Sequence, residues 1–303
     1  MYVPSIFVTD MGQQITAIPM KQTINCRGKL IDFSTPLVMG VINVTPDSFF
    51  DGGKYNSESG IIERAKMHLE AGAAILDVGA MSTRPKAEMI AESEELERLI
   101  PAVKLLRTTF PEAVISVDTF RSSIAQAAIE AGADMINDIS GGTMDDAMFT
   151  TIAKLQVPYV LMHIQGTPET MQDNPHYNKV TQEVITDLML KAHQLKQLGV
   201  HDIIIDPGFG FGKTLEHNLS LLQNLNHFAV LGHPILAGLS RKSMINRVLG
   251  TKPENALNGT TALNMIALER GASILRVHDV KEAMECVKLN NAISNSNSNF
   301  GDS

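Results

Sequence analysis

The chain has 303 residues, with 25 Lys and Arg against 33 Asp and Glu, a net charge of −8 and 44% hydrophobic residues. This composition supplies one large core, so it excludes intrinsic disorder for the bulk of the chain, and an acidic chain without basic clusters is a poor nucleic-acid binder. The cysteines match no metal-binding spacing, no apolar run reaches the roughly 18 residues of a membrane span, and no signal peptide is visible, so we expect a cytoplasmic protein.

Residues 1–36 do not share the pattern of the rest of the chain. Two short alternating runs, Ile15 to Ile18 and Thr23 to Ile31, predict a β-hairpin, because alternation of apolar and polar residues is typical of half-buried strands. We expect this hairpin to close the floor of the domain that follows.

Apolar runs of strand length recur from residue 37 onward. In EAGAAILD (70–77), EAGADMIND (130–138) and ERGASILRV (269–277), a Gly suited to ending a helix is followed by an apolar run and, five positions after the Gly, by Asp77, Asn137 or Arg276. Continuous apolar runs of this length are typical of parallel strands buried on both faces. With a looser copy at 199–206, the other runs are Leu37 to Ile42, Ala113 to Val117, Val157 to Met162 and Ile235 to Leu239.

Helical spacing separates these runs. It is followed by Leu96, Leu99, Ile100, Val103 and Leu106, and again by Val184, Ile185, Leu188, Ala192 and Leu195. Alternation of eight strands with helices over roughly 250 residues is the pattern of a TIM (β/α)8 barrel, which we place at residues 37–290. An open doubly wound sheet is the alternative, but it needs a Gly-rich phosphate turn after an early strand. The low-complexity residues 291–303 are predicted as a disordered tail.

Each predicted strand is followed by a polar residue. Enzymes on this fold carry their active sites at the carboxyl ends of the strands, so we expect one converging site there. The strand-end residues are Asn43, Asp77, Asp118, Asn137, His163, Asp206, Ser240 with Lys242, and Arg276 with His278.

These residues form two chemical sets. Asp118, Asn137 and Asp206 supply acceptors, so a flat ring that carries N–H and NH₂ groups is a better guest for them than a phosphate. The second set suits an anion, with or without a divalent ion, and consists of Arg276, His278, Lys242 and Asn43.

Two Gly-rich stretches accompany the strand ends. DPGFGFGK (206–213) has the wrong spacing for a dinucleotide turn, and we expect its glycines to let backbone approach a planar ligand, with Phe209 or Phe211 near the ligand's face. The stretch from Asn43 to Tyr55 is predicted to be a mobile lid. A nucleophile elbow, a HExxH pair, a Walker loop and a CxxC motif are all missing from the sequence, so no covalent nucleophile is predicted.

Seven motifs appear in an order that resembles the dihydropteroate synthases. They are NVTPDSF (43–49), STRP (82–85), SVDT (116–119), IND (136–138), DPGFGFGK (206–213), SRKS (240–243) and RVHDV (276–280). The resemblance spans residues 37 to 280 and implies a transferase of folate biosynthesis. Such an enzyme condenses (7,8-dihydropterin-6-yl)methyl diphosphate with 4-aminobenzoate, with the help of Mg²⁺, to give 7,8-dihydropteroate and diphosphate.

The resemblance also implies roles for residues. The pterin would be held by Asp118, Asn137, Asp206 and Lys242, with Met162 and Phe211 beside it. Diphosphate would be held by Arg276, His278 and Asn43, and Asn43 would also ligate the metal. The 4-aminobenzoate site, where sulfonamides act, would be bordered by Thr83, Arg84, Ser240, Pro46 and Phe49. Catalysis would rest on Asp118, Asp206, Lys242 and Arg276, which favour departure of diphosphate from a pterin-stabilised cation that the amine then attacks.

The resemblance also implies an oligomeric state, because family members are usually homodimers.

The sequence departs from the family pattern at one place, and two alternative functions stay open. Many family members carry an acidic residue just before STRP, where this chain has Met81, and this chain has Lys86 just after it, so we expect differences in aminobenzoate and sulfonamide binding but not in the reaction. The alternatives are a pterin-binding methyltransferase domain, which usually adjoins a cobalamin domain, and a non-catalytic pterin- or phosphate-binding barrel.

Overall fold

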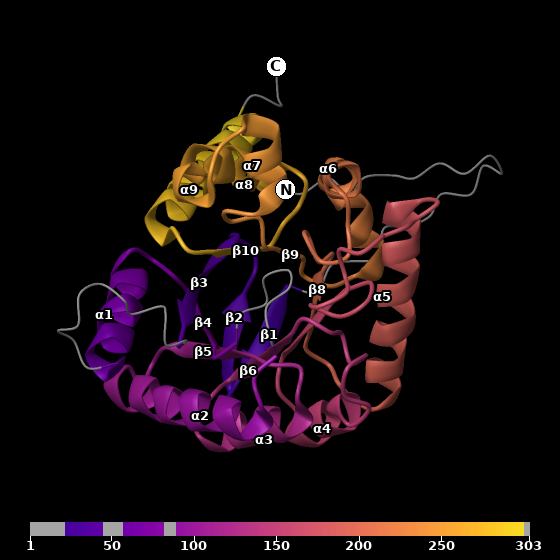
Figure 1. Cartoon of the computed structure of the whole chain (residues 1–303). Helices are drawn as coiled ribbons and strands as arrows, with labels where there is room; N and C mark the ends of the chain where they lie inside the picture. The colour runs from indigo at the N-terminus through magenta and orange to yellow at the C-terminus, as the bar shows by residue number, and fades with distance from the viewer. Residues whose placement is uncertain (1–21, 45–56, 82–88, 300–303) are drawn as a thin grey trace.

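The eight parallel strands follow one another in chain order around a barrel (Figure 1). They are β3 (Leu37–Asn43), β4 (Ile75–Gly79), β5 (Val114–Asp118), β6 (Met135–Asp138), β7 (Tyr159–Met162), β8 (Ile203–Asp206), β9 (Leu236–Ala237) and β10 (Ile274–Val277). Strand β10 pairs with both β9 and β3, and a parallel bridge between Ile205 and Ile235 closes the ring. The computed structural model describes residues 22–44, 57–81 and 89–299, and it confirms the predicted TIM barrel.

Helices alternate with the strands and pack around the outside of the barrel (Figure 1). They are α1 (Ser57–Glu70), α2 (Glu92–Thr109), α3 (Ser122–Glu130), α4 (Met148–Leu155), α5 (Val180–Gln197), α6 (Leu215–Gln223), α7 (Ser243–Leu249), α8 (Leu257–Glu269) and α9 (Val280–Asn299), with 3₁₀ turns at Leu225–Leu231 and Pro253–Asn255. Helices α2 and α5 bury the predicted faces, for example Leu99 and Leu188. Helix α9 continues past residue 290, so residues 291–299, expected to be disordered, are helical.

The predicted N-terminal hairpin forms, and both of its described strands come from the second predicted run. The run from Thr23 to Ile31 itself folds back, giving the antiparallel strands β1 (Thr23–Cys26) and β2 (Lys29–Asp32). The turn falls at Arg27 and Gly28, whose φ angles of 51° and 85° are typical of two-residue hairpin loops. The other predicted run, Ile15 to Ile18, lies outside the described residues.

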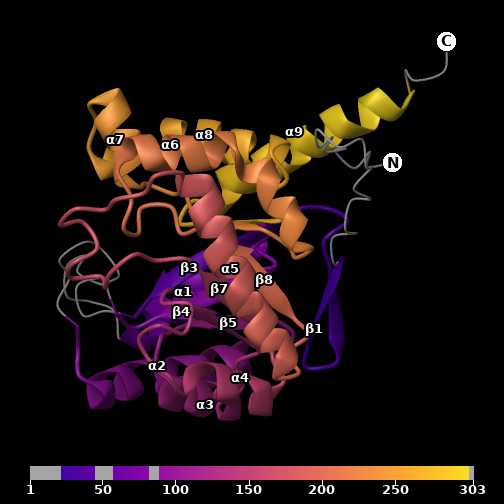
Figure 2. The same ribbon diagram turned by 90° about the vertical axis from the view of Figure 1, so that its right-hand side faces the viewer.

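The floor of the barrel is an apolar layer to which every strand contributes one side chain. Ile24 and Cys26 of β1 pack against this layer and cover it, as predicted (Figure 2 shows the hairpin at one end of the barrel). The eight strand residues are Met39, Ile75, Val114, Met135, Val160, Ile204, Leu236 and Ile274. Because side chains alternate along a strand, the residues two positions later also point into the barrel, nearer to the carboxyl ends.

Candidate functional site

The layer above the apolar floor is largely polar. Two positions beyond the floor residues, the strands place Asp77, Ser116, Asn137, Asp206 and Arg276 inside the barrel. The first four are buried, whereas the side chain of Arg276 keeps 21% of its surface exposed. A polar layer directly over an apolar floor, at the carboxyl ends of the strands, is where enzymes of this fold carry their active sites.

Arg276 is the centre of this layer. Its Nε donates to Asp77 Oδ2 at 2.6 Å, and its Nη2 donates to Asp118 Oδ2 at 2.8 Å. Asn137 Nδ2 donates to the same oxygen of Asp77 at 3.1 Å. One guanidinium from β10 therefore orients carboxylates from β4 and β5, and one of these carboxylates fixes the amide from β6.

This arrangement brings the two chemical sets together. Arg276, of the set that suits an anion, is bonded to Asp118 of the acceptor set and to Asp77. Closure of the barrel is the reason, because only β3 lies between β10 and β4. Buried carboxylates are strongly unfavourable without a partner, and Arg276 supplies the positive charge that they need.

The loop after β8 forms another wall of the site. Asp206 Oδ1 accepts a hydrogen bond from the backbone of Gly208 at 2.7 Å, and Lys242 Nζ donates to the carbonyl of Phe209. The same nitrogen lies 4.8 Å from the centroid of the Phe211 ring, within range of a cation–π interaction. Phe209 packs in the outer core, so Phe211 is the phenylalanine that faces the site, in an apolar rim cluster that includes Met162.

The loops after β9 and β10 meet at the mouth. Ser240 Oγ lies 3.0 Å from His278 Nδ1, and the backbone N–H of His278 donates to the same hydroxyl at 3.2 Å. Arg241 forms a two-point ion pair with Asp279, with N···O distances of 2.9 and 2.6 Å. These contacts tie together the two loops that carry the expected residues Ser240, Lys242 and His278.

Burial perturbs the ionisable groups. It raises the pKa of Asp118 to about 7, with Arg276 opposing the shift and Asp77 reinforcing it. It also raises the pKa of Asp206, against the pull of Lys242, and lowers the pKa of Lys242 to about 8, against the pull of Asp206. Burial acts to lower the pKa of Arg276, but Asp77 and Asp118 outweigh it, so that this pKa lies above its usual range. Shifted pKa values on converging groups are typical of functional sites.

Some expected residues lie elsewhere or beyond the described chain. Asn43 is exposed at the end of β3. His163 is buried and contacts Lys213, instead of joining the strand-end site. Residues 45–56 and 82–88 are outside the described residues, and with them lie most of the lid stretch, Lys86, and the predicted site residues Pro46, Phe49, Thr83 and Arg84. Met81, just before the second gap, is buried in the apolar rim cluster.

The sequence alone predicts no role for Asp77 and Lys213. Asp77 ends a strand, and in the structure it contacts both Arg276 and Asn137. The sequence does contain a signal for this contact, because these three residues occupy the same position, five after a Gly, in the repeated units. Lys213 ends DPGFGFGK, and nothing in the sequence indicates its burial.

The described residues offer few protein ligands for a divalent ion. Within residues 22–44, 57–81 and 89–299, no group of three or more His, Cys, Asp and Glu could hold a metal. Asn43 is exposed at the end of β3, and its side chain has an amide oxygen. Because Mg²⁺ commonly binds one or two protein groups together with substrate phosphates and water, the residues suit an ion held mainly by a diphosphate.

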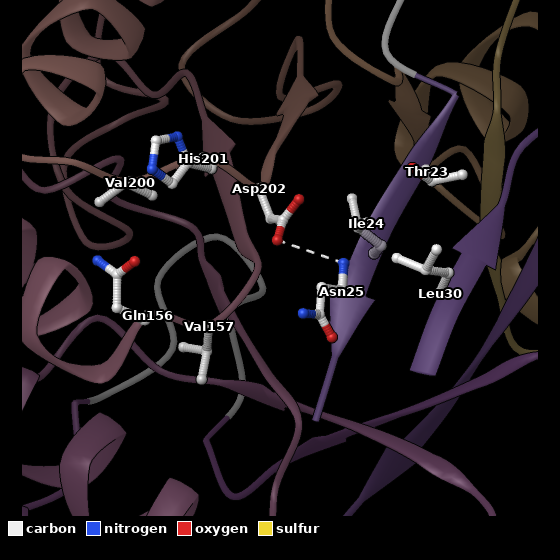
Figure 3. Close-up of a pocket in the computed structure, with 9 residues that line it drawn as sticks. All are labelled: Thr23, Ile24, Asn25, Leu30, Gln156, Val157, Val200, His201 and Asp202. Atoms are coloured by element: carbon white, nitrogen blue, oxygen red, sulfur yellow. Dashed lines mark hydrogen bonds between the residues drawn. The ribbon is translucent and has the colours of Figure 1, made fainter. Parts of the chain in front are cut away.

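A cavity of about 400 Å³ lies at the opposite end of the barrel, between the hairpin and the segments before β7 and β8 (Figure 3). Asn25 and Leu30 line one side, and Gln156, Val200 and Asp202 line the other. The backbone N–H of Asn25 donates to Asp202 Oδ2 at 3.2 Å. None of the strand-end residues lines this cavity, so it is separate from the candidate site.

Comparison with known proteins identifies the class. Residues 39–278 match a family described as pterin binding enzyme, so the barrel and its site are those of a pterin-binding enzyme. The chain is 43% identical over 269 residues to a dihydropteroate synthase of Haemophilus influenzae, covering 88% of this chain and 97% of the relative. It is 41% identical over 281 residues to that of Bacillus subtilis, with 92% and 96% covered. The chain therefore belongs to the dihydropteroate synthase family, and it is an enzyme of the transferase class.

Solved structures agree. A Yersinia pestis dihydropteroate synthase in complex with a sulfonamide drug superimposes with a TM-score of 0.85, 38% identity, and coverage of 90% of this chain and 99% of that one. Xanthomonas albilineans dihydropteroate synthase with 4-aminobenzoic acid superimposes with a TM-score of 0.84 and 38% identity, and covers 90% of this chain and 98% of that one. The same enzyme with 7,8-dihydropteroate superimposes with a TM-score of 0.81 and 36% identity, with the same coverage of 90% and 98%.

In the part of the chain that the structure describes, no helix is long and apolar enough to cross a membrane.

Proposed function

We propose that this chain condenses (7,8-dihydropterin-6-yl)methyl diphosphate with 4-aminobenzoate to give 7,8-dihydropteroate and diphosphate, as a step of folate biosynthesis. The observation that carries the proposal is the network of Arg276 with Asp77 and Asp118 at the carboxyl ends of the strands. It provides acceptors for a ring that carries N–H groups and a cation for a departing anion in one chamber. The complexes of relatives with 4-aminobenzoic acid and 7,8-dihydropteroate support the same chemistry.

The pterin ring occupies the polar layer in this proposal. Asp118, Asn137 and Asp206 offer buried acceptors. The N–H groups of the ring donate hydrogen bonds to these acceptors and replace the hydrogen bonds that water would make. Met162 and Phe211, 2% and 9% exposed, offer apolar surface to its faces. Lys242 stays beside Phe211, where it can donate to a ring oxygen or nitrogen.

The reaction needs no covalent nucleophile. Diphosphate leaves with the electron pair of the C–O bond, and the electron-rich pterin stabilises the methylene cation that remains. Asp118 and Asp206 favour this developing positive charge, while Arg276 and Lys242 favour the negative charge that grows on the leaving group. The amine of 4-aminobenzoate then attacks the cation and loses a proton. The protein supplies positioning and electrostatic stabilisation.

The leaving diphosphate is held at the mouth by Arg276, His278 and Asn43. His278 is exposed there and is oriented by Ser240, and Arg276 keeps part of its guanidinium accessible. Asn43, together with the diphosphate, would hold Mg²⁺, which would neutralise charge on the leaving group.

The 4-aminobenzoate is bordered by Ser240 and by Thr83, Arg84, Pro46 and Phe49, as the family resemblance implies. Sulfonamides compete for this place. Met81 contributes apolar surface to the rim cluster, and it precedes STRP in the sequence, in the position where many family members carry an acid. We expect its effect to be confined to affinity for aminobenzoate and sulfonamides.

The enzyme acts as a homodimer in the cytoplasm. Large exposed apolar side chains are concentrated on the outer faces of α6 to α9, which lie together on one side of the barrel (Figures 1 and 2). They include Leu219, Val248, Leu249, Ile266, Leu289 and Ile293. Apolar surface of this kind marks protein interaction sites.

Cys26 and Cys286 are free and buried, which suits a reducing compartment.

The test is formation of 7,8-dihydropteroate by the purified protein, followed with release of diphosphate, with and without 4-aminobenzoate. We expect both products only when both substrates and Mg²⁺ are present. In Asp206→Asn, an amide donor replaces an acceptor that faces the N–H groups of the ring, and loss of a charge-assisted hydrogen bond of roughly 1.5–3 kcal/mol should weaken pterin binding at least about tenfold. An unchanged dissociation constant by calorimetry would place the pterin elsewhere.

A further inference from the structure

Lys213 is a buried lysine that the reaction described above does not use. It ends the Gly-rich stretch after β8 and is 2% exposed. Its ammonium nitrogen lies 2.9 Å from the carbonyl oxygens of both Gly208 and Phe211 and 3.3 Å from that of His163. Among the ion pairs of the described residues, none includes Lys213. A buried charge is very unfavourable unless it is well hydrogen-bonded, so these carbonyl groups must compensate for its burial.

His163 supplies a fourth acceptor. Its Nδ1 lies 3.0 Å from the nitrogen of Lys213, and because an ammonium can only donate, the ring accepts at Nδ1 and carries its proton on Nε2. Burial, followed by the positive charge of Lys213, lowers the pKa of His163 to about 2. The imidazole is therefore neutral and suited to this role.

Lys213 joins two loops where their backbones lie close together. Gly208, with φ at 72°, lies so near the loop after β7 that a Cβ atom would fall 1.9 Å from the carbonyl oxygen of His163. Only glycine permits this contact. The ammonium bonds to both sides of it, to His163 in the loop after β7 and to Gly208 and Phe211 in the loop after β8.

Side chains hold the loop after β8 through its carbonyl groups. Every carbonyl from residue 208 to residue 212 accepts a hydrogen bond from a side chain. The donors are Lys213 to Gly208 and Phe211, Lys242 to Phe209, Gln172 to Gly210, and Tyr177 to Gly212. Of these side chains, Lys213 is the one that holds two of the carbonyls. The loop is therefore preorganised by side-chain donors and not by a helix or strand.

The residues that Lys213 holds are those that shape the pterin pocket. The backbone N–H of Gly208 donates to Asp206 Oδ1, and so orients that carboxylate. The ring of Phe211 faces Lys242 at 4.8 Å, and the carbonyl of the same residue is fixed by Lys213. A displacement of this loop would move the Asp206 acceptor and the apolar wall together.

We propose that Lys213 is a positioning residue, whose buried ammonium ties the loops after β7 and β8 and thereby sets Asp206 and Phe211 for binding the pterin ring. The proposal rests on the pterin pocket described under the proposed function and assigns a role that neither Lys242 nor the Arg276 network performs. Lys213 does not touch the substrate.

The charge state of Lys213 makes this role depend on pH. Burial lowers its pKa to about 7; Asp206, at the end of β8, and Asp187, on α5, oppose this shift, while Lys242, before α7, and Lys191, on α5, add to it. A neutral amine has two N–H groups and directs a lone pair at the acceptors, so we expect the loops to be held less firmly above about pH 7. The lysine of an unfolded chain titrates near 10.4. Between these pH values the unfolded chain binds more protons, and the contribution of Lys213 to the free energy of unfolding rises with pH.

The experiment compares two ligands that occupy different parts of the site. Calorimetry measures 6-hydroxymethylpterin, which needs the pterin pocket, and inorganic diphosphate with Mg²⁺, which needs the mouth. In Lys213→Met, an apolar chain of similar length leaves the carbonyls without donors, and we expect pterin affinity to fall at least about tenfold while diphosphate affinity stays within about twofold. Lys213→Gln keeps N–H donors without the charge and should give an intermediate loss. Lys66→Met is the control, because Lys66 pairs with Glu70 on α1 and should change neither affinity.

Each outcome decides the matter. Equal pterin affinity in wild type and a folded Lys213 variant overturns the positioning role and leaves the proposed function intact. Parallel losses for both ligands, or failure of both variants to fold, make Lys213 a general structural residue and also overturn it. If the wild type does not bind 6-hydroxymethylpterin, the pterin pocket itself is wrong and the proposal falls with it. A wild type that binds the pterin but forms no dihydropteroate contradicts the proposed reaction alone.

Discussion

Asp77 connects two site residues through a single carboxylate oxygen, which accepts from both Arg276 and Asn137. Asp77→Asn removes the charge of the carboxylate and can place an amide N–H donor against the N–H donors of Arg276 and Asn137. Hydrogen bonds to charged groups contribute roughly 1.5–3 kcal/mol, so we expect kcat/KM to fall about ten- to a hundredfold in steady-state kinetics. Glu70→Gln, which breaks an exposed ion pair with Lys66 on α1, is the control and should have little effect. Unchanged kinetics in Asp77→Asn would mean that Asp118 alone orients Arg276.

The charge of Asp118 should control the acid side of the pH profile. Burial raises its pKa to about 7, so as pH falls through 7 it gains a proton and no longer favours the developing cation. We expect kcat/KM to decline there, and Asp118→Asn to give a low rate without this acid limb.

Stability should respond to Asp118 in the opposite sense. The native carboxyl binds its proton more tightly than that of the unfolded chain, which titrates near 3.9. Its contribution to the free energy of unfolding is therefore fully present below about pH 4 and is lost as pH rises toward 7. Denaturation measured at several pH values beside the kinetics separates loss of charge from unfolding. An acid limb that persists in Asp118→Asn would assign it to another group.

At the scale of elements, the N-terminal hairpin is a structural cover and not part of the site. Ile24 is fully buried against the apolar floor, whereas Leu30, on the other strand of the hairpin, is 67% exposed. Ile24→Ala should lower the free energy of unfolding by roughly 2–5 kcal/mol, as large-to-small changes in a core do, and leave kcat and KM unchanged. Leu30→Ala is the matched control, with little effect on denaturant unfolding. Lost activity in a fully stable Ile24→Ala protein would contradict this division.

The strands could be read from the sequence because each is a short apolar run bounded by turn residues. Predicted and observed runs differ by a few residues at most, for example Val157 to Met162 against Tyr159–Met162. The turn of the hairpin, Arg27 and Gly28, could not be predicted because it lies inside a run whose alternation is typical of one strand. Periodicity reports which face is buried, but it does not show where a strand reverses.

At the scale of the whole molecule, contacts across the barrel could not be read from the sequence. The strand-end rule found Asp118, Asn137, Asp206 and Arg276 because it depends only on the order of strands. The hydrogen bond from Arg276 to Asp77, which are separated by 199 positions, forms only because the barrel closes and because both side chains point into it. The position of Lys213 likewise depends on how two loops pack, and no local pattern encodes that.

The proposed homodimer makes a prediction for the same scale. Val248 and Leu249 on α7 are 58% and 51% exposed, among the apolar residues concentrated on α6 to α9. Replacing both by Glu places charges that an interface would have to desolvate, at a cost of several kcal/mol. We expect the wild type to have the mass of two chains by light scattering and Val248→Glu/Leu249→Glu that of one. Met189→Glu/Leu190→Glu is the matched control, because this pair on α5 is 50% and 57% exposed and should stay dimeric. If both double variants remain dimeric, the interface lies on another face, and a monomeric wild type would show that the homodimer proposal is wrong.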